Sequence, residues 1–208
     1  MHFTNIYNAI KNASEKPLET HEILSGYSGE KLLATLMNLS RYNLDDDKVY
    51  LEVGVFQGLS LLSVANSIGN NLAFGIDNFA FFDKDGKNES IVHSRIEKLN
   101  LKNVRLINQD YEDALENLGD YIGDKKVGVF FIDGPHDYRS QLMCLLLIKP
   151  YLSDDAVIII DDSNYRHVRQ ANRDFLQTNN DYKLFFEAYT PSHPDNMSKL
   201  ELEQAKHG

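Results

Sequence analysis

Short apolar runs alternate with helical stretches from residue 47 onward, and this alternation restricts the possible folds more than any other feature. Two of the runs, Val127–Ile132 and Val157–Ile160, are apolar without polar alternation, which is typical of strands covered on both faces. Buried strands separated by helices predict an α/β fold with a doubly wound, mostly parallel sheet. The other expected strands are Val49–Val53, Leu72–Ile76, Val104–Asn108 and Lys183–Ala188.

The pattern divides the chain into three parts. Residues 1–46 are expected to form a helical leader that acts as a lid, because apolar residues recur at helical spacing on both sides of a Gly-rich break. Residues 47–190 carry the alternation and form the expected ligand-binding domain, whose ligands should sit beyond the C-terminal ends of the strands. Residues 191–208 are expected to be a polar tail. The expected helices after the leader are Leu59–Ser67, Glu89–Leu99, Glu112–Leu118, Arg139–Lys149 and Val168–Thr178.

Charge and cysteine content exclude several classes of partner and site. The 21 basic and 31 acidic residues give a net charge of −10, which argues against a surface for nucleic acid or anionic membrane. Cys144 is the only cysteine and lies in an apolar run, so we expect a buried thiol and neither an intramolecular disulfide nor a cysteine metal cluster. The chain shows neither a signal-peptide pattern nor an apolar run long enough to span a bilayer, so the expected location is cytoplasmic.

A glycine-containing loop follows the first expected strand. Gly54 and Gly58 stand in a Glu-x-Gly-x-x-x-Gly pattern that begins at Glu52, where glycine permits a tight turn and the close approach of a ligand. Asp77 ends the next strand, where an acid suits a ribose hydroxyl pair. The pattern is not the Gly-x-Gly-x-x-Gly of nicotinamide enzymes, which makes a nicotinamide oxidoreductase a poor fit. The alternative is a structural turn with a surface aspartate.

This loop resembles that of the class I S-adenosylmethionine-dependent methyltransferases. The resemblance implies the Rossmann-like methyltransferase fold and S-adenosylmethionine as cofactor. It implies that Glu52, Gly54 and Gly58 form the loop at the methionine part and that Asp77 binds the ribose. Gln109 and Asp110, after the third strand, match the segment that contacts adenine, although Asp110 is equally suited to cap a helix.

Three aspartates follow the fourth and fifth expected strands. Asp133 ends one strand and Asp161 and Asp162 end the next, so neighbouring strands would bring all three to one rim. Carboxylates this close repel one another unless they are protonated or joined by a cation, and a hard ion such as Mg²⁺ prefers oxygen ligands. We therefore expect Asp133, Asp161 and Asp162 to be metal ligands. The alternative is that each aspartate only caps a helix or begins a turn.

The same segments resemble the bacterial metal-dependent O-methyltransferases of the macrocin and mycinamicin type, which methylate sugar hydroxyls. The shared features are an Asp-Gly-x-His-x-Tyr stretch, here Asp133–Tyr138, and the double acid Asp161-Asp162. The resemblance implies that Asp133 acts at the catalytic centre beside the cofactor and that His136 is the general base. A turn histidine bonded to the nearby backbone is the alternative for His136.

The expected function is Mg²⁺-assisted O-methylation of a small hydroxylated acceptor, such as a sugar or another natural product. The alternatives are a metal-independent methyltransferase and a cofactor-binding protein without catalysis. A fold of this family usually ends in a hairpin whose last strand inserts into the sheet, and the sequence offers no such strand after Ala188. The chain is therefore expected to be truncated, to lack the final strand, or to receive that strand from a partner, and an unpaired strand edge predicts a homodimer.

Overall fold

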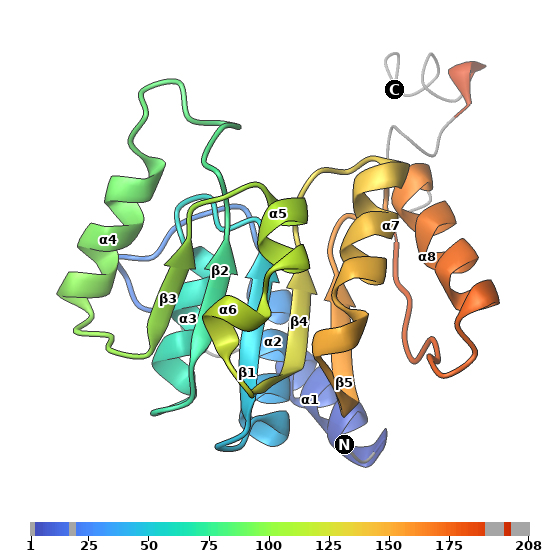
Figure 1. The fold of residues 1–208 in the computed structure, drawn as a ribbon, viewed down its shortest axis with the longest axis horizontal. Helices are drawn as coiled ribbons and strands as arrows, with labels where there is room; N and C mark the ends of the chain where they lie inside the picture. The colour runs from blue at the N-terminus through green and yellow to red at the C-terminus, as the bar shows by residue number, and fades with distance from the viewer. Residues whose placement is uncertain (1–2, 17–19, 190–197, 201–208) are drawn as a thin grey trace.

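A computed structural model describes residues 3–16, 20–189 and 198–200. It confirms the doubly wound parallel sheet, with five strands in the order β3-β2-β1-β4-β5 and helices on both faces (Figure 1). The strands are β1 Lys48–Val53, β2 Ala73–Ile76, β3 Val104–Ile107, β4 Lys126–Ile132 and β5 Leu152–Ile160. The helices are α1 Phe3–Glu15, α2 Glu30–Asn43, α3 Leu59–Ser67, α4 Asn88–Lys98, α5 Tyr111–Glu116, α6 Gly119–Ile122, α7 Tyr138–Leu147 and α8 Arg166–Thr178, with a 3-10 turn at Lys149–Tyr151.

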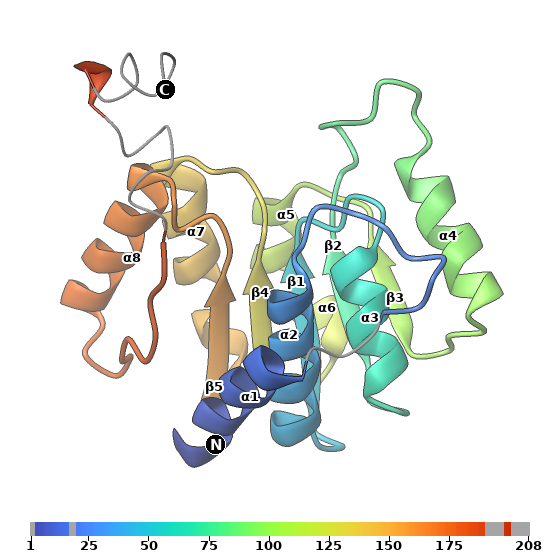
Figure 2. The ribbon, with the colours of Figure 1, turned by 180° about the vertical axis from the view of Figure 1, so that it is seen from behind.

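Each face of the sheet carries its own hydrophobic core. Alternate residues of β1 point to opposite sides, so Tyr50 packs in one core while Val49 and Leu51 pack in the other. Helices α2 and α3 cover the first face, and α5, α7 and α8 cover the second, as the front and back views show (Figures 1 and 2). Cys144 lies in the second core and is buried, as expected.

The N-terminal leader contributes to the central core. Leu33, Leu36 and Met37 of α2 are buried against the first face of the sheet. The side-chain amide of Asn43 donates to the carbonyl oxygen of Gly128 at 2.6 Å, which ties the end of α2 to β4. Most of the leader therefore supports the sheet, and the segment between α1 and α2 is the part that reaches the candidate site.

The register of the parallel strands places their C-terminal ends at one edge. Val53 at the end of β1 pairs with Ile76 of β2 and with Ile132 of β4, and Ile132 in turn pairs with Ile160 of β5. The loops that follow these residues must therefore begin side by side. This shared edge positions Gly54, Asp77, Asp133 and Asp161 around one space.

Two expectations about the end of the sheet are wrong. Lys183–Ala188 is extended but forms no strand in the described chain. The segment is exposed and makes other contacts, since the Phe185 ring stacks on Phe3 with centroids 5.7 Å apart and the backbone carbonyl of Ala188 accepts from the Ser163 hydroxyl. As a result, β5 is the edge strand of the described sheet, and Val157–Ile160 is half-buried rather than fully covered.

Other boundaries differ in smaller ways. The expected helix Glu112–Leu118 ends at Glu116 and is followed by the separate short helix α6. Most of the expected tail, residues 191–208, lies outside the described residues. None of the described helices combines the length and the apolar character needed to cross a membrane.

Candidate active site

A cavity of about 580 Å³ lies at the C-terminal edge of the sheet. Its walls come from the loops after all five strands and from the segment between α1 and α2. The residues proposed from the sequence that line it are Gly54, Asp77, Gln109, Asp110, Asp133, His136, Asp161 and Asp162. The structure thus brings the glycine loop after β1 and the three aspartates after β4 and β5 to the same cavity.

The loop after β1 needs glycine at two positions for different reasons. Gly54 has a φ of 92°, and a Cβ there would stand 1.9 Å from the carbonyl oxygen of Asp133. This close approach joins the end of β1 to the loop after β4. Gly58 has a φ of 82° at the start of α3 and packs against Leu62 and Val92, so it shapes the loop without lining the cavity.

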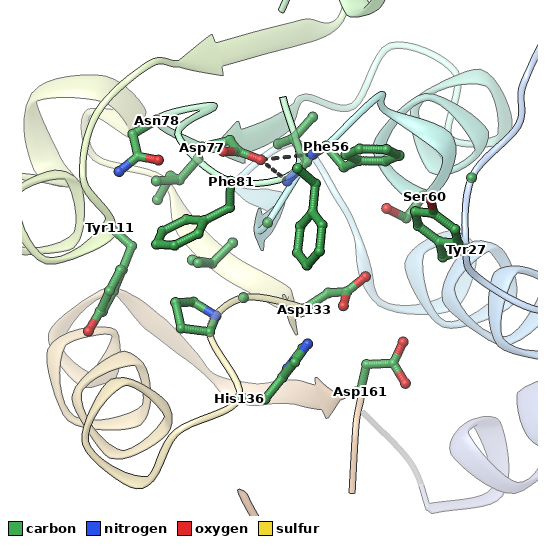
Figure 3. Close-up of a pocket in the computed structure, with 18 of the residues that line it drawn as sticks. Tyr27, Phe56, Ser60, Asp77, Asn78, Phe81, Tyr111, Asp133, His136 and Asp161 are labelled. Atoms are coloured by element: carbon green, nitrogen blue, oxygen red, sulfur yellow. Dashed lines mark hydrogen bonds between the residues drawn. The ribbon is translucent and has the colours of Figure 1, made fainter. Parts of the chain in front are cut away.

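Asp77 organises this loop from the neighbouring strand. Its Oδ2 accepts hydrogen bonds from the backbone N–H groups of Val55 and Phe56, both at 2.8 Å (Figure 3). Its Oδ1 accepts from the N–H of Phe79 at 2.7 Å. A carboxylate offers about four acceptor positions, so these three bonds leave capacity for a further donor from the cavity.

Glu52 lies beneath the loop and does not line the cavity. Its side chain is completely buried and accepts hydrogen bonds from the hydroxyls of Tyr50 at 2.7 Å and Ser60 at 3.1 Å. Burial, with a smaller contribution from the charge of Asp133, raises the pKa of Glu52 to about 8. Glu52 therefore supports the loop from below as a carboxyl group that is readily protonated.

Gln109 and Asp110 line the cavity beyond β3. Asp110 caps α5 by accepting a hydrogen bond from the N–H of Glu112 at 2.9 Å, so its two expected roles are compatible. The Gln109 side-chain oxygen accepts from the hydroxyl of Tyr121 at 2.9 Å. This contact fixes the amide of Gln109 at the cavity wall.

The three aspartates after β4 and β5 converge. One carboxylate oxygen from each of Asp133, Asp161 and Asp162 lies within 4.8 Å of the others, and all three side chains are partly buried. Burial, together with the charges of Asp161 and Asp162, raises the pKa of Asp133 to about 8. Such mutual repulsion is relieved when a cation lies between the carboxylates. An oxygen-only donor set of this kind suits a hard divalent ion.

His136 lies against this cluster. Its Nε2 is 3.0 Å from Oδ2 of Asp162, and its ring stacks on Tyr165 with centroids 5.0 Å apart. Asp133, Asp161 and His136 lie together, apart from Asn78 and Tyr111 at the other end of the cavity (Figure 3). The local backbone at Asp162 has a φ of 54°, an unusual conformation for a residue other than glycine.

Aromatic side chains from two loops also line the cavity and were not proposed as site residues. Tyr27 comes from the leader, and its ring lies 5.3 Å from that of Phe56. Phe81 and Phe82 come from the loop between β2 and α4. The aromatic content of residues 78–87 was the available signal for the second loop, whereas nothing in the sequence placed Tyr27 beside Phe56.

The leader segment is fixed by specific contacts. A Cβ on Gly26 would stand 2.9 Å from Cβ of Leu59, so only glycine passes α3 at this distance. The guanidinium of Arg95 donates to the carbonyl oxygen of Gln57 at 2.6 Å and to both the carbonyl and the hydroxyl of Ser25. Arg95 thereby joins the leader segment to the glycine loop.

Comparison with known proteins gives one family and a set of related folds. A family model described as a methyltransferase domain matches residues 51–163. Uncharacterized protein R132 of Acanthamoeba polyphaga mimivirus is 31% identical over 136 residues, which is 63% of this chain. The chain spans 59% of the length of that curated relative.

Solved structures resemble this one at low sequence identity. CalS11, described as a TDP-rhamnose 3'-O-methyltransferase of calicheamicin biosynthesis, has a TM-score of 0.59 at 17% identity, covering 83% of this chain and 84% of its own. An O-methyltransferase from Bacillus cereus in complex with SAH has a TM-score of 0.57 at 16% identity, covering 84% and 78%. Because the family match extends over more than half of the residues, the chain belongs to the methyltransferase domain family and to the class I S-adenosylmethionine-dependent methyltransferases.

Proposed function

We propose that the chain transfers a methyl group from S-adenosylmethionine to a hydroxyl of a small acceptor, with a divalent cation such as Mg²⁺ held by Asp133, Asp161 and Asp162. The observation that carries the proposal is that the acidic cluster and the glycine loop line the same cavity. A sugar or another hydroxylated natural product fits this reaction. The family match and the O-methyltransferase folds support it.

The residues of the cavity suit the proposed cofactor. Gly54 and Val55 form the turn before α3, and Ser60 of that helix also lines the cavity, so a helix N-terminus faces the space where an anionic methionine carboxylate would sit. Asp77 would accept a hydrogen bond from a ribose hydroxyl at its remaining acceptor position. Gln109 and Asp110 are the polar groups beside the proposed adenine position.

Three carboxylates and one imidazole would perform the chemistry at the other end. When bound, S-adenosylmethionine supplies the methyl group, and Mg²⁺ lowers the pKa of the acceptor hydroxyl and orients it. Asp133, Asp161 and Asp162 would hold the cation, and Asp133 would also lie beside the cofactor. His136 receives the hydroxyl proton in this proposal, because it is the imidazole that lines the cavity. Positioning the two reactants supplies much of the remaining acceleration.

Calorimetric titration of S-adenosylmethionine and S-adenosylhomocysteine, with and without Mg²⁺, tests the cofactor assignment. The wild type should bind both, and Asp77→Asn should weaken both by about tenfold or more, because one acceptor oxygen is replaced by a donor. Asp124→Asn, a change of the same kind at an exposed residue outside the cavity, should bind as the wild type does. An inability of the folded wild type to bind either compound would refute the proposal.

We also propose that two copies associate through the edge of β5. This strand is the edge of the described sheet, and an unpaired edge is able to extend a ladder into a second molecule. Sedimentation should show a concentration-dependent dimer. A monomer at every concentration up to the solubility limit would refute this part of the proposal without affecting the reaction.

A further inference from the structure

The charges and rings that line the cavity narrow the class of acceptor. We propose that the acceptor is a hydroxylated ring compound that carries no negative charge. This inference rests on the methyl transfer proposed above and specifies the molecule that receives the methyl group. Two independent features of the cavity support it, namely the signs of its charges and the exposure of its aromatic side chains.

The ionisable side chains of the cavity are predominantly acidic. Five carboxylates line it, from Asp77, Asp110, Asp133, Asp161 and Asp162, and the described lining contains no lysine or arginine. Asp77 and Asp110 accept hydrogen bonds from backbone N–H groups at the proposed cofactor end. The other three face the proposed acceptor end, where one divalent cation leaves the cluster with a net negative charge. A carboxylate or phosphate on the acceptor would be repelled there.

The basic residues of the neighbouring segments do not line the cavity. The guanidinium of Arg95 is engaged by the Ser25 and Gln57 oxygens. Lys84 and Arg166 are exposed and do not line the cavity. An anionic acceptor, such as a nucleoside diphosphate sugar, would therefore meet carboxylates without a partner for its phosphates.

Exposed aromatic side chains form part of the cavity wall, and Tyr27 is the labelled ring on the side of Asp133 and Asp161 (Figure 3). The exposed fraction of the side chain is 91% for Tyr27, 71% for Phe81 and 84% for Phe82. The rings of Tyr27 and Phe81 lie on opposite sides of the cavity (Figure 3). Exposed apolar rings beside a cavity are typical of a binding surface. Flat rings stack favourably on other rings and attract cations above their faces. The combination of carboxylates and aromatic faces thus favours a neutral or cationic ring.

Three matched diphenols separate these possibilities by charge alone. Catechol is neutral, dopamine is cationic and 3,4-dihydroxybenzoate is anionic, while all three share the same ring and hydroxyl pair. Their binding to the protein saturated with Mg²⁺ and S-adenosylhomocysteine is measured by calorimetry or by saturation-transfer NMR, so no turnover is needed. The anionic compound should bind at least about tenfold more weakly than catechol, and dopamine at least as tightly as catechol.

Variants test which side chains produce the preference. Tyr27→Ala should weaken catechol binding by about 3- to 10-fold, the range expected for loss of one ring contact. Tyr42→Ala removes an exposed tyrosine of α2 that does not line the cavity, and it should leave binding unchanged. If the anionic diphenol binds as tightly as catechol, the charge inference is wrong, and loss of that binding in Arg166→Ala would identify Arg166 as the partner of the carboxylate.

The possible failures are distinguishable. Binding of S-adenosylhomocysteine is measured first, and its absence would defeat the proposed methyl transfer itself. If that binding is present, equal or tighter binding of 3,4-dihydroxybenzoate overturns the charge inference alone. If none of the three diphenols binds at concentrations up to about 10 mM, the ring inference is wrong, because a site shaped for such rings should bind at least one of them at that concentration.

Discussion

The Nε2 atom of His136 lies 3.0 Å from Oδ2 of Asp162, so the proposed base contacts a proposed metal ligand directly. The stacked ring of Tyr165 keeps the imidazole in this orientation. The contact joins the segment after β4 to the double acid after β5. A change at either residue is therefore expected to affect both cation binding and proton transfer.

Asp162→Asn should weaken Mg²⁺ binding by about tenfold or more, because it removes one of three anionic oxygen ligands. Calorimetric titration with Mg²⁺ measures the change. His136→Gln keeps a polar group beside Asp162 and should lower the rate of methyl transfer more than it lowers Mg²⁺ affinity. If Asp162→Asn binds Mg²⁺ as tightly as Asp124→Asn does, the acidic cluster is not the cation site.

Glu52 makes the stability of the fold depend on pH. Its pKa is raised from about 4.5 to about 8, so the folded state binds more protons than the unfolded state between these values. Stability should therefore fall as pH rises through this interval, by at most about 1.4 kcal/mol per pH unit. Glu52→Gln cannot ionise and should lose less stability over the same range, measured by urea unfolding at several pH values. Parallel stability curves for the two proteins would contradict the assignment.

Gly54→Ala should destabilise the fold by more than about 3 kcal/mol, because the methyl group would overlap the carbonyl of Asp133 and the backbone has positive φ. Gly69→Ala is the matched control. Gly69 also has a positive φ, of 64°, but its position is open, so only the strain of about 1 kcal/mol is expected. Thermal or urea unfolding compares the two. Equal losses would mean that the ends of β1 and β4 are not held this closely.

Arg95→Ala should raise the dissociation constant for S-adenosylhomocysteine by about 3- to 10-fold, since the guanidinium holds Ser25 and Gln57, which adjoin residues that line the cavity. Arg95 is a positioning residue, so Arg95→Lys should restore only part of the affinity. Lys98→Ala, at an exposed position of the same helix, serves as the control. Should Arg95→Ala match this control while remaining folded, the leader segment does not contribute to the cofactor site.

The sequence predicted those parts of the site that depend on strand order. Asp133 and Asp161 could be placed together because neighbouring parallel strands end at one edge, which needs no knowledge of loop shape. The bonds from Asp77 to the Val55 and Phe56 amides could not be foreseen, because they require Phe56 at a φ of 51°. Residue type and spacing predict which side chain stands at a position. They do not predict the backbone path of a loop, on which these contacts depend.

The incorrect strand at Lys183–Ala188 has a related cause. Its residues have the composition of a strand, but a strand exists only where a neighbour pairs with it, and the Phe185 ring stacks on Phe3 of α1 while Phe186 is exposed. Tyr27 shows the same limit for the site. It reaches the cavity because Gly26 passes close to Leu59, a contact between segments far apart in the sequence.

The central claim is that one cavity holds the methyl donor and the divalent cation together. Proton NMR of the S-methyl group of protein-bound S-adenosylmethionine, during titration with paramagnetic Mn²⁺, tests it without an acceptor. The account predicts strong broadening of the methyl signal in the wild type, reversal by excess Mg²⁺, and loss of the effect in Asp161→Asn but not in Asp124→Asn. A methyl signal that stays sharp at saturating Mn²⁺ would contradict the account.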